Sequence, residues 1–405
     1  MRTAGIICEY NPFHTGHKRQ IDILRSMGYD CIICVMSGNY TQRGEMAIFD
    51  KYTRAESALL GGADLIVELP FPFSSLSAEG FANAGVYILS SLGVDAISFG
   101  SECGDILLLE RAAEAVLSRE FPAIYNEAQR GGNGSASAFF EAISRIIGED
   151  VSVLSNDILG ISYVAASKRL GASLEIVPIK REGAAYNEKE LSKGEYPSAS
   201  AIRNAIGAAD GKMDIVLSDH IPERTLQALI GAKNRGLGPV FADSVEKEIL
   251  SFFRLMTPAE ITARAVARSG GGEHVAEDGC GILERICHAA RKADTLWELL
   301  ESSYNSKYTD ARINRVILFS IFAVSDRLTR SLPEYTALLG ASESGRRYLS
   351  HIRKKCELPI ITKPADAPNG VQRAIGETAD AFYSSAFPRK TGFDHFIKAR
   401  PFMLK

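Results

Sequence analysis

One pattern recurs four times in the first half of the chain, and it constrains the fold more than any other feature. A glycine suited to ending a helix is followed by an apolar run of about five residues and then by a polar or Gly/Pro-containing loop. The four stretches are GYDCIICVMSG, GADLIVELPF, GVDAISFGSE and GASLEIVPIKREG, and a fifth apolar run occupies residues 3–8. Apolar residues at helical spacing fill segments between them, at 51–60, 78–92 and 158–170. This alternation predicts an α/β fold with a parallel sheet.

The predicted sheet also indicates where a ligand would bind. In parallel sheets ligands lie beyond the carboxyl ends of the strands, so the loops after the apolar runs form the candidate site. Those loops are residues 11–17, 37–44, 100–102 and 181–186. We also expect the carboxylates of Glu9 and Glu102 to face the site, although the sequence assigns neither one a role as a base.

The composition excludes several classes of protein. The 405 residues are 46% hydrophobic and 23% charged, with a net charge of −3. No apolar run reaches the ~18 residues of a membrane span, and no signal-peptide pattern precedes the first strand. Seven cysteines, mostly inside apolar runs, favour a reducing compartment. We therefore expect a cytoplasmic protein with no membrane association and no stable protein partner.

Cys31 and Cys34 form a CxxC spacing, but no second Cys/His pair stands at ligand distance in the sequence. A buried strand explains YDCIICVM more simply, so no metal site is predicted.

The stretch EYNPFHTGHKRQ, residues 9–20, joins the first strand to the first predicted helix. His14 and His17 share one face of the first helical turn, where free N–H groups and the helix dipole favour an anion. Gly16 allows close approach of the backbone, and Asn11 and Pro12 favour a turn. A structural role for the histidines remains an alternative at this point.

A second candidate anion site is YPSASAIRNAI, residues 196–206. Ser198 and Ser200 are candidate N-caps, and Arg203 lies in the first turn of the helix that follows. Hydroxyls, backbone donors and one forked cation suit an oligophosphate. An ordinary capping motif is the alternative.

Several motifs, taken in order, resemble one family. HTGH and SASAIR are similar to the HxGH and ISSTxIR signatures of the HIGH nucleotidyltransferase superfamily, with Ala199 where the second motif often has Ser. GIICEYNPFHTGH, VMSGNYTQRGE, DLIVELPF, FGSE, SNDILGISYV and KREGAAYN resemble, in this order, the bacterial tRNA(Met) cytidine acetate ligase family, and the resemblance continues through SKYTDARINRVIL and LPIITKP. It implies a Rossmann-like nucleotidyltransferase domain that activates acetate with ATP to acetyl-adenylate. It further implies acetyl transfer to N4 of the wobble cytidine of elongator methionine tRNA.

The resemblance also assigns residues. His14, His17, Ser198 and Arg203 would act in catalysis by stabilising charge on the phosphates. ATP would be contacted by Ile7, Cys8, Glu9, Tyr10, Asn11, Pro12, Phe13, His14, Thr15, Gly16, His17, Lys18, Arg19, Gln20, Gly100, Asn156 and Arg181. Magnesium is expected to neutralise the departing pyrophosphate, although the sequence has no carboxylate cluster of dedicated ligands.

The second half of the chain lacks the strand pattern. We predict a catalytic domain over 1–206, with a flexible loop at 117–137, and a mainly helical tRNA-binding domain over 207–405. The segments 284–324 and 334–356 are expected to be helical, and basic residues concentrate there. A solvated helix face would explain such charges, but the resemblance favours RNA. The arginines chosen as RNA contacts are Arg312, Arg315, Arg346 and Arg347.

Two other functions compete with the ligase at this stage. A small-molecule adenylyltransferase of the same fold would explain the two anion motifs but not the basic helical half. A non-catalytic tRNA-binding protein would explain the basic half, but it would have no need of the intact His14, His17, Ser198 and Arg203.

Overall fold

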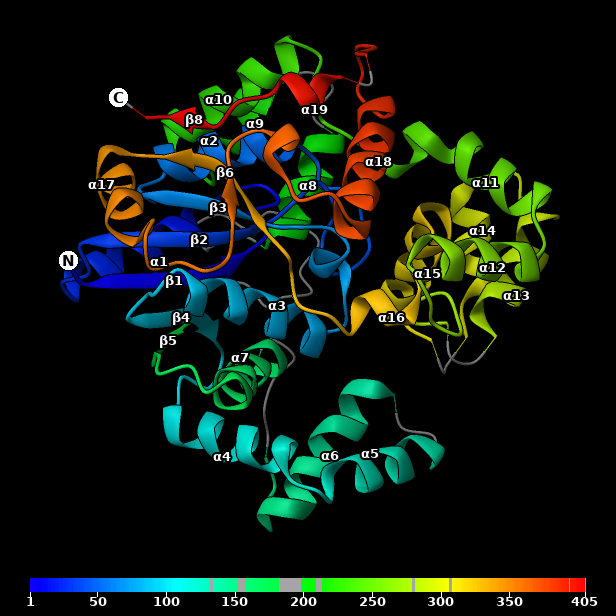
Figure 1. The fold of residues 1–405 in the computed structure, drawn as a ribbon, viewed down its shortest axis with the longest axis horizontal. Coiled ribbons are helices and arrows are strands. Elements are labelled where there is room, and N and C mark those ends of the chain that lie inside the picture. Colours follow the sequence, from blue (N-terminus) through cyan, green and yellow to red (C-terminus); the bar gives the residue numbers. More distant parts are fainter. Residues whose placement is uncertain are drawn as a thin grey trace.

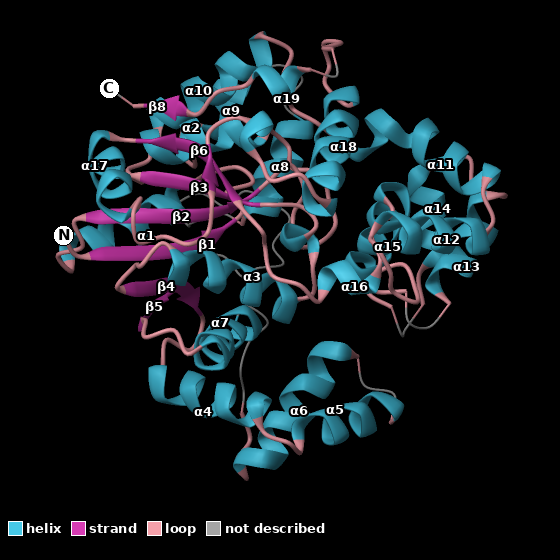
Figure 2. Ribbon diagram, viewed as in Figure 1, coloured by secondary structure: helices cyan, strands magenta, loops and turns pink. Residues whose placement is uncertain are grey.

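An eight-stranded sheet forms the centre of the molecule (Figure 2). The computed structural model describes residues 1–131, 134–151, 157–181, 198–208, 213–278, 281–305, 308–392 and 394–404. The strands are β1 (Thr3–Cys8), β2 (Cys31–Ser37), β3 (Leu65–Leu69), β4 (Ala96–Ser101), β5 (Glu175–Lys180), β6 (Thr336–Ala341), β7 (Ile360–Ile361) and β8 (Phe402–Met403). Their order is β5-β4-β1-β2-β3-β6-β7, with β8 also paired to β6.

The predicted α/β fold with a parallel sheet is confirmed. β1 to β5 are mutually parallel and coincide with the five apolar runs. The glycines that open the four repeated stretches all have positive φ, as helix-ending residues do; they are Gly28, Gly62, Gly93 and Gly171. The predicted helices are present as α1 (Thr15–Ser26), α2 (Lys51–Leu60), α3 (Ala78–Ser91) and α7 (Asp157–Leu170).

Alternate residues of the strands bury against different helices. Ile6 of β1 and Cys34 of β2 belong to a core that includes residues of α1 and α2. Their neighbours Ile7 and Val35 belong to a second core with α3 and α7. Because successive strand residues point to opposite faces, these near-continuous apolar runs produce a three-layer α/β/α arrangement (Figure 1).

The loop predicted at 117–137 is largely helical instead. The segment after β4 forms α4 (Ile106–Leu117), α5 (Phe121–Arg130) and α6 (Ser135–Ile147). Phe121 stacks on Tyr125 and meets Phe139 edge-on, so α5 and α6 bury an aromatic cluster between them. Of the residues that suggested a loop, Ser118, Gly131 and Gly134 lie at the ends of these helices.

The predicted helical character of the second half is found for much of its length. After α8 (Ala199–Ala208) come α9 (Met213–Leu217), α10 (Glu223–Asn234), α11 (Glu246–Leu255), α12 (Pro258–Arg268), α13 (Ile282–Ala290), α14 (Leu296–Ser303), α15 (Asp310–Phe322), α16 (Asp326–Thr329), α17 (Glu343–Ile352), α18 (Val371–Ser385) and α19 (His395–Lys398). Within the described ranges, none of the helices has both the length and the apolar character needed to cross a bilayer.

The boundary predicted at residue 206 does not follow the sheet. β6, β7 and β8 come from the last 70 residues, and β6 pairs antiparallel with β3. The predicted helix over 334–356 is therefore wrong in its first part, where TALLGA forms β6. A short apolar run of this kind has no periodicity that separates strand from helix, and only pairing with β3 decides it.

Candidate active site

A cavity of about 300 Å³ opens at the carboxyl ends of β1, β4 and β5. Its wall combines the start of α1, residues 41–45, one face of α7 and the start of α8. The site therefore lies at the edge of the sheet that the strand pattern predicts.

His14 and His17 both cap the first turn of α1. Nδ1 of His14 accepts the N–H of Gly16 at 3.1 Å, and Nδ1 of His17 accepts the N–H of His14 at 3.3 Å. Because each Nδ1 accepts a hydrogen bond through its lone pair, the proton of each neutral ring is carried on Nε2. The pair thus performs the structural role and still offers two Nε2–H donors.

The two rings stay neutral for a physical reason. Burial lowers the pKa of His14 to about 3, with further contributions from Arg181 and His220. Burial also lowers the pKa of His17 well below its usual range, followed by the effects of His14 and Arg181. The ring centroids of His14 and His17 are 3.7 Å apart, and Tyr10 packs 4.7 Å from His17. The donors are therefore held in fixed positions before a ligand arrives.

The second predicted anion motif faces the same cavity. Oγ of Ser198 accepts the N–H of Ala201 at 3.1 Å, which caps α8 as predicted. Arg203 donates to the carbonyl of Asn11 at 3.1 Å and to Oγ of Ser200 at 3.1 Å, so its guanidinium is anchored beside the turn that carries the histidines. His14, His17, Ser198 and Arg203 are thus brought together around one cavity.

Gly100 and Arg181 are adjacent at the ends of β4 and β5. A Cβ added at Gly100 would lie 3.3 Å from Cγ of Arg181, which is closer than an ordinary contact. The absence of a side chain at Gly100 therefore leaves room for Arg181 along the wall of the cavity.

The other predicted ATP residues divide into three groups. His14, His17, Gly100 and Arg181 have been described above. The cavity is also lined by eight further members of the predicted set: Ile7, Cys8, Glu9, Tyr10, Asn11, Gly16, Arg19 and Gln20. Pro12, Phe13, Thr15 and Lys18 are not among the lining residues, and Lys18 pairs with Asp22 on the surface. Asn156 lies outside the described residues.

The sequence did not single out the apolar part of the wall. Phe81, Phe99, Leu159 and Tyr163 line the cavity from the sheet and from α3 and α7. Their strand and helix periodicity marked them only as core. Glu102, expected to face the site, is not among the lining residues.

The loop over 38–50 contributes Thr41, Gln42, Arg43 and Glu45 to the wall of the cavity, and distant parts of the chain hold this loop in place. Asn39 donates to Asp380 of α18 at 2.8 Å, Tyr40 donates to the carbonyl of Ala379, and Tyr383 donates to the carbonyl of Ala47. On its other side, Arg315 of α15 donates to the carbonyl of Gln42 at 3.4 Å.

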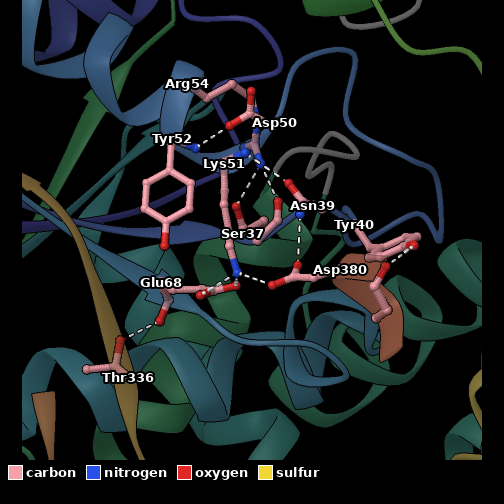
Figure 3. A network of polar contacts seen from close by, with 12 residues as sticks. Ser37, Asn39, Tyr40, Asp50, Lys51, Tyr52, Arg54, Glu68, Thr336 and Asp380 are labelled. Carbon is pink, nitrogen blue, oxygen red and sulfur yellow. Dashed lines mark hydrogen bonds and ion pairs between the residues drawn. The ribbon is translucent and has the colours of Figure 1, made fainter. Parts of the chain in front are cut away.

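A second buried polar cluster lies behind this loop (Figure 3). Nζ of Lys51 is 2.9 Å from Glu68 of β3 and 2.7 Å from Asp380 of α18, and its side chain is 7% exposed. Burial alone would lower the pKa of Lys51, but Asp380 and Glu68 outweigh it and raise the pKa well above its usual range. We call Lys51, Glu68 and Asp380 the Lys51 triad. A cavity of only about 50 Å³ lies beside it.

The four arginines chosen as RNA contacts do not form one surface. Arg312 and Arg315 lie on α15, whereas Arg346 and Arg347 lie on α17, beside the amino-terminal edge of the sheet (Figure 1). The side chain of Arg315 is 8% exposed and pairs with Glu277 at 2.7 Å, so the charge of this guanidinium is already paired within the protein. Arg346 and Arg347 are exposed.

A metal site was not predicted. Within the described ranges, His, Cys, Asp and Glu side chains nowhere gather in threes that could hold a metal ion.

A parallel sheet that carries an HxGH turn and a Ser/Arg helix start around one cavity defines a nucleotidyltransferase. The chain matches the HIGH Nucleotidyl Transferase family over residues 1–394. It is 35% identical over 381 residues to the tRNA(Met) cytidine acetate ligase of Acetivibrio thermocellus, covering 90% of this chain and 89% of that protein. It is 34% identical over 399 residues to the ligase of the same name from Caldanaerobacter subterraneus, covering 96% and 95%.

Solved structures agree with the sequence relatives. The apo crystal structure of Thermotoga maritima TmcAL superposes with a TM-score of 0.88 at 33% identity, and both chains are covered completely. A second crystal structure of that protein, bound with alpha-thio ATP, gives a TM-score of 0.85 at 31% identity, again over the whole of both chains. This chain belongs to the tRNA(Met) cytidine acetate ligase family.

Proposed function

We propose that this protein is a tRNA(Met) cytidine acetate ligase. It activates acetate with ATP to acetyl-adenylate and then acetylates N4 of the wobble cytidine of elongator methionine tRNA. The observation that carries the proposal is the pair of neutral, preorganised Nε2–H donors in a cavity that also receives the start of α8.

The geometry supports a specific division of work in adenylation. Acetate attacks the α-phosphorus in line and pyrophosphate leaves, so catalysis consists mostly of positioning and of stabilising charge on oxygens. His14 and His17 would donate to oxygens that gain charge. Arg203, Ser198 and the N-terminus of α8 would hold the outer phosphates. Gly100 and Arg181 would border the nucleoside.

Magnesium belongs to the proposal as a companion of the triphosphate. The described residues supply no group of three metal-ligating side chains, so this part of the chain builds no dedicated site for the ion. Bound magnesium would supply neutralisation of the pyrophosphate charge.

For the RNA we retain Arg312, Arg346 and Arg347 as proposed contacts. Arg315 is left out because its charge is buried against Glu277. We also propose a cytoplasmic location. The six cysteines within the described ranges form no disulfide, as expected in a reducing compartment.

The test uses purified protein, ATP, labelled acetate and elongator methionine tRNA. We expect label to enter the tRNA as N4-acetylcytidine, with AMP and pyrophosphate as products. A matched tRNA with uridine at the wobble position should remain unlabelled. Transfer of AMP to a small molecule in place of the tRNA would instead identify an adenylyltransferase, and binding of tRNA without any reaction would identify a non-catalytic protein.

A further inference from the structure

The second half of the proposed reaction needs a group that accepts a proton. The N4 amine attacks the carbonyl carbon of acetyl-adenylate, the N–C bond forms, and the C–O bond to the phosphate breaks. AMP leaves with that electron pair as a phosphate anion and needs no proton. N4 therefore has one proton to lose, and the cavity must hold a base.

Most described groups around the cavity cannot serve. Each histidine uses Nδ1 as an acceptor and bears its proton on Nε2, so neither ring has a free lone pair. Burial raises the pKa of the Cys8 thiol and of the Tyr10 and Tyr163 phenols. The remaining titratable wall residues are cations, apart from two carboxylates, Glu9 and Glu45.

The two carboxylates are held differently. Glu45 lies on the 38–50 loop, is 41% exposed, and stands 3.8 Å from Arg203. Glu9 is partly buried at the end of β1, five residues before His14. One of its oxygens, Oε1, accepts the N–H of Gln42 at 2.7 Å. Among the described residues, the other oxygen has no hydrogen-bond partner.

We propose that Glu9 is the base that takes the proton from N4 during acetyl transfer. This inference rests on the proposed function. Gln42 fixes one oxygen of the carboxylate, and the other is left for the amine at the edge of the sheet where the histidines would hold the adenylate.

The surroundings of Glu9 suit this role. Burial raises its pKa, and Glu45 adds to that effect, whereas the N–H of Gln42 and the charges of Arg203 and Arg54 oppose it. Tyr163 faces it from α7. A carboxylate with a raised pKa is a stronger base, yet it remains ionised above that pKa.

Glu9→Gln is the informative variant. Its amide oxygen still accepts the N–H of Gln42, so the loop is held as before, but the amide cannot take a proton. Glu9→Asp keeps a base and shortens the side chain. Glu102→Gln is the matched control, because Glu102 follows β4 at the same edge of the sheet and does not line the cavity.

The experiment separates the two halves of the reaction. Chemically prepared acetyl-adenylate is mixed with enzyme and methionine tRNA in a single turnover, and acetate-dependent exchange of pyrophosphate into ATP is measured without tRNA. We expect Glu9→Gln to slow transfer by about 10²–10⁴-fold. Exchange should fall by much less than transfer, because the carboxylate and the amide present the same oxygen to Gln42. Transfer by wild type should rise with pH to a plateau, and this dependence should vanish in Glu9→Gln and persist in Glu9→Asp and Glu102→Gln.

Two results would overturn the inference. Normal transfer by Glu9→Gln would show that another group takes the proton. An equal loss of transfer and exchange would assign Glu9 to the nucleotide. Failure of the proposed function is a separate outcome, because wild-type protein itself would then leave the tRNA unlabelled.

Discussion

Two polar clusters are buried on either side of the 38–50 loop, and they differ in what their polar atoms have left to offer. In the Lys51 triad one cation is shared by two carboxylates, and the remaining space is about 50 Å³. In the active-site cavity Nδ1 of each histidine accepts a hydrogen bond in capping α1, and Nε2–H remains as a donor beside about 300 Å³ of space.

This difference in unused hydrogen-bonding capacity distinguishes a structural cluster from a functional site more clearly than burial or charge does. Both clusters contain ionisable groups removed from water, and both have strongly shifted pKa values. In the triad the charged groups are paired with one another, so the triad connects β3, α2 and α18. The histidine pair keeps two Nε2–H donors that have no acceptor among the described residues. Unused hydrogen-bonding capacity in a roomy cavity, rather than a perturbed pKa alone, marks the site.

The largest effect is expected from breaking the triad. Lys51→Met leaves Glu68 and Asp380 facing each other in the interior, and we expect a loss of about 3–5 kcal/mol in the free energy of unfolding. Urea denaturation measures it. The control is Lys18→Met, which removes an exposed pair with Asp22 and should cost less than about 1 kcal/mol. Equal small effects in both variants would mean that the triad contributes no more than a surface pair.

For His17→Gln we expect a loss of catalytic rate without a loss of stability. Glutamine at the third helical position can still close a capping box, so folding should be preserved. Loss of the Nε2–H donor should slow acetate-dependent pyrophosphate exchange by about 10²–10³-fold. Stability and tRNA binding should stay close to wild type. A variant that folds, binds tRNA and exchanges at the normal rate would contradict the role given to His17.

The pH dependence of stability gives a smaller, graded test. The pKa of His14 is lowered from 6.5 to about 3 in the folded chain. Between these two pH values the unfolded chain binds a proton on this ring and the folded chain does not. The contribution to stability is complete above about pH 6.5 and is lost progressively as the pH falls toward 3. His14→Asn keeps an N-cap without a titrating ring. Between pH 7.5 and pH 5, the free energy of unfolding of this variant should fall by about 2 kcal/mol less than that of wild type. Parallel stability curves would show that the ring is not buried in the neutral form.

Exposed charges should behave like neither cluster. If Arg346 and Arg347 contact RNA phosphates, changing both to Ala should weaken tRNA binding and reduce the slope of log K against log salt by about one to two units. Pyrophosphate exchange and stability should not change. The same measurement on Arg312→Ala tests whether α15 contacts the RNA. An unchanged slope in both variants would move the RNA surface elsewhere.

The parallel sheet and the position of the two motifs at its edge could be predicted from the sequence, because local signals decide them. Glycines with positive φ end helices before the apolar runs, and the spacing of His14 and His17 places both on one helical turn. These features depend on residues near each other in the chain. The resemblance to a family added the chemistry.

The remaining parts depend on contacts between distant residues. β6 is a strand only because it pairs with β3, and Arg315 is buried only because Glu277 and the 38–50 loop meet it. The apolar wall of the cavity has the same hydrophobic signal as ordinary core. No role as a base could be assigned to Glu9 from the sequence, and that proposal depends on the hydrogen bonds that engage Nδ1 of both neighbouring histidines.

The clamp of α18 on the 38–50 loop has a consequence for how the protein is made. Asn39 and Asp380 are separated by 341 residues, which a ribosome adds in about 20–70 s at typical rates. After β5 has been made and until β6 follows, the nascent chain has its five parallel strands while β3 lacks the neighbour that later covers its edge. The wall of the cavity lacks its support until α18 has been made. An uncovered strand edge invites pairing with other chains. The wall of the cavity is therefore completed late in synthesis, and the interval before that is the period in which a chaperone would matter most.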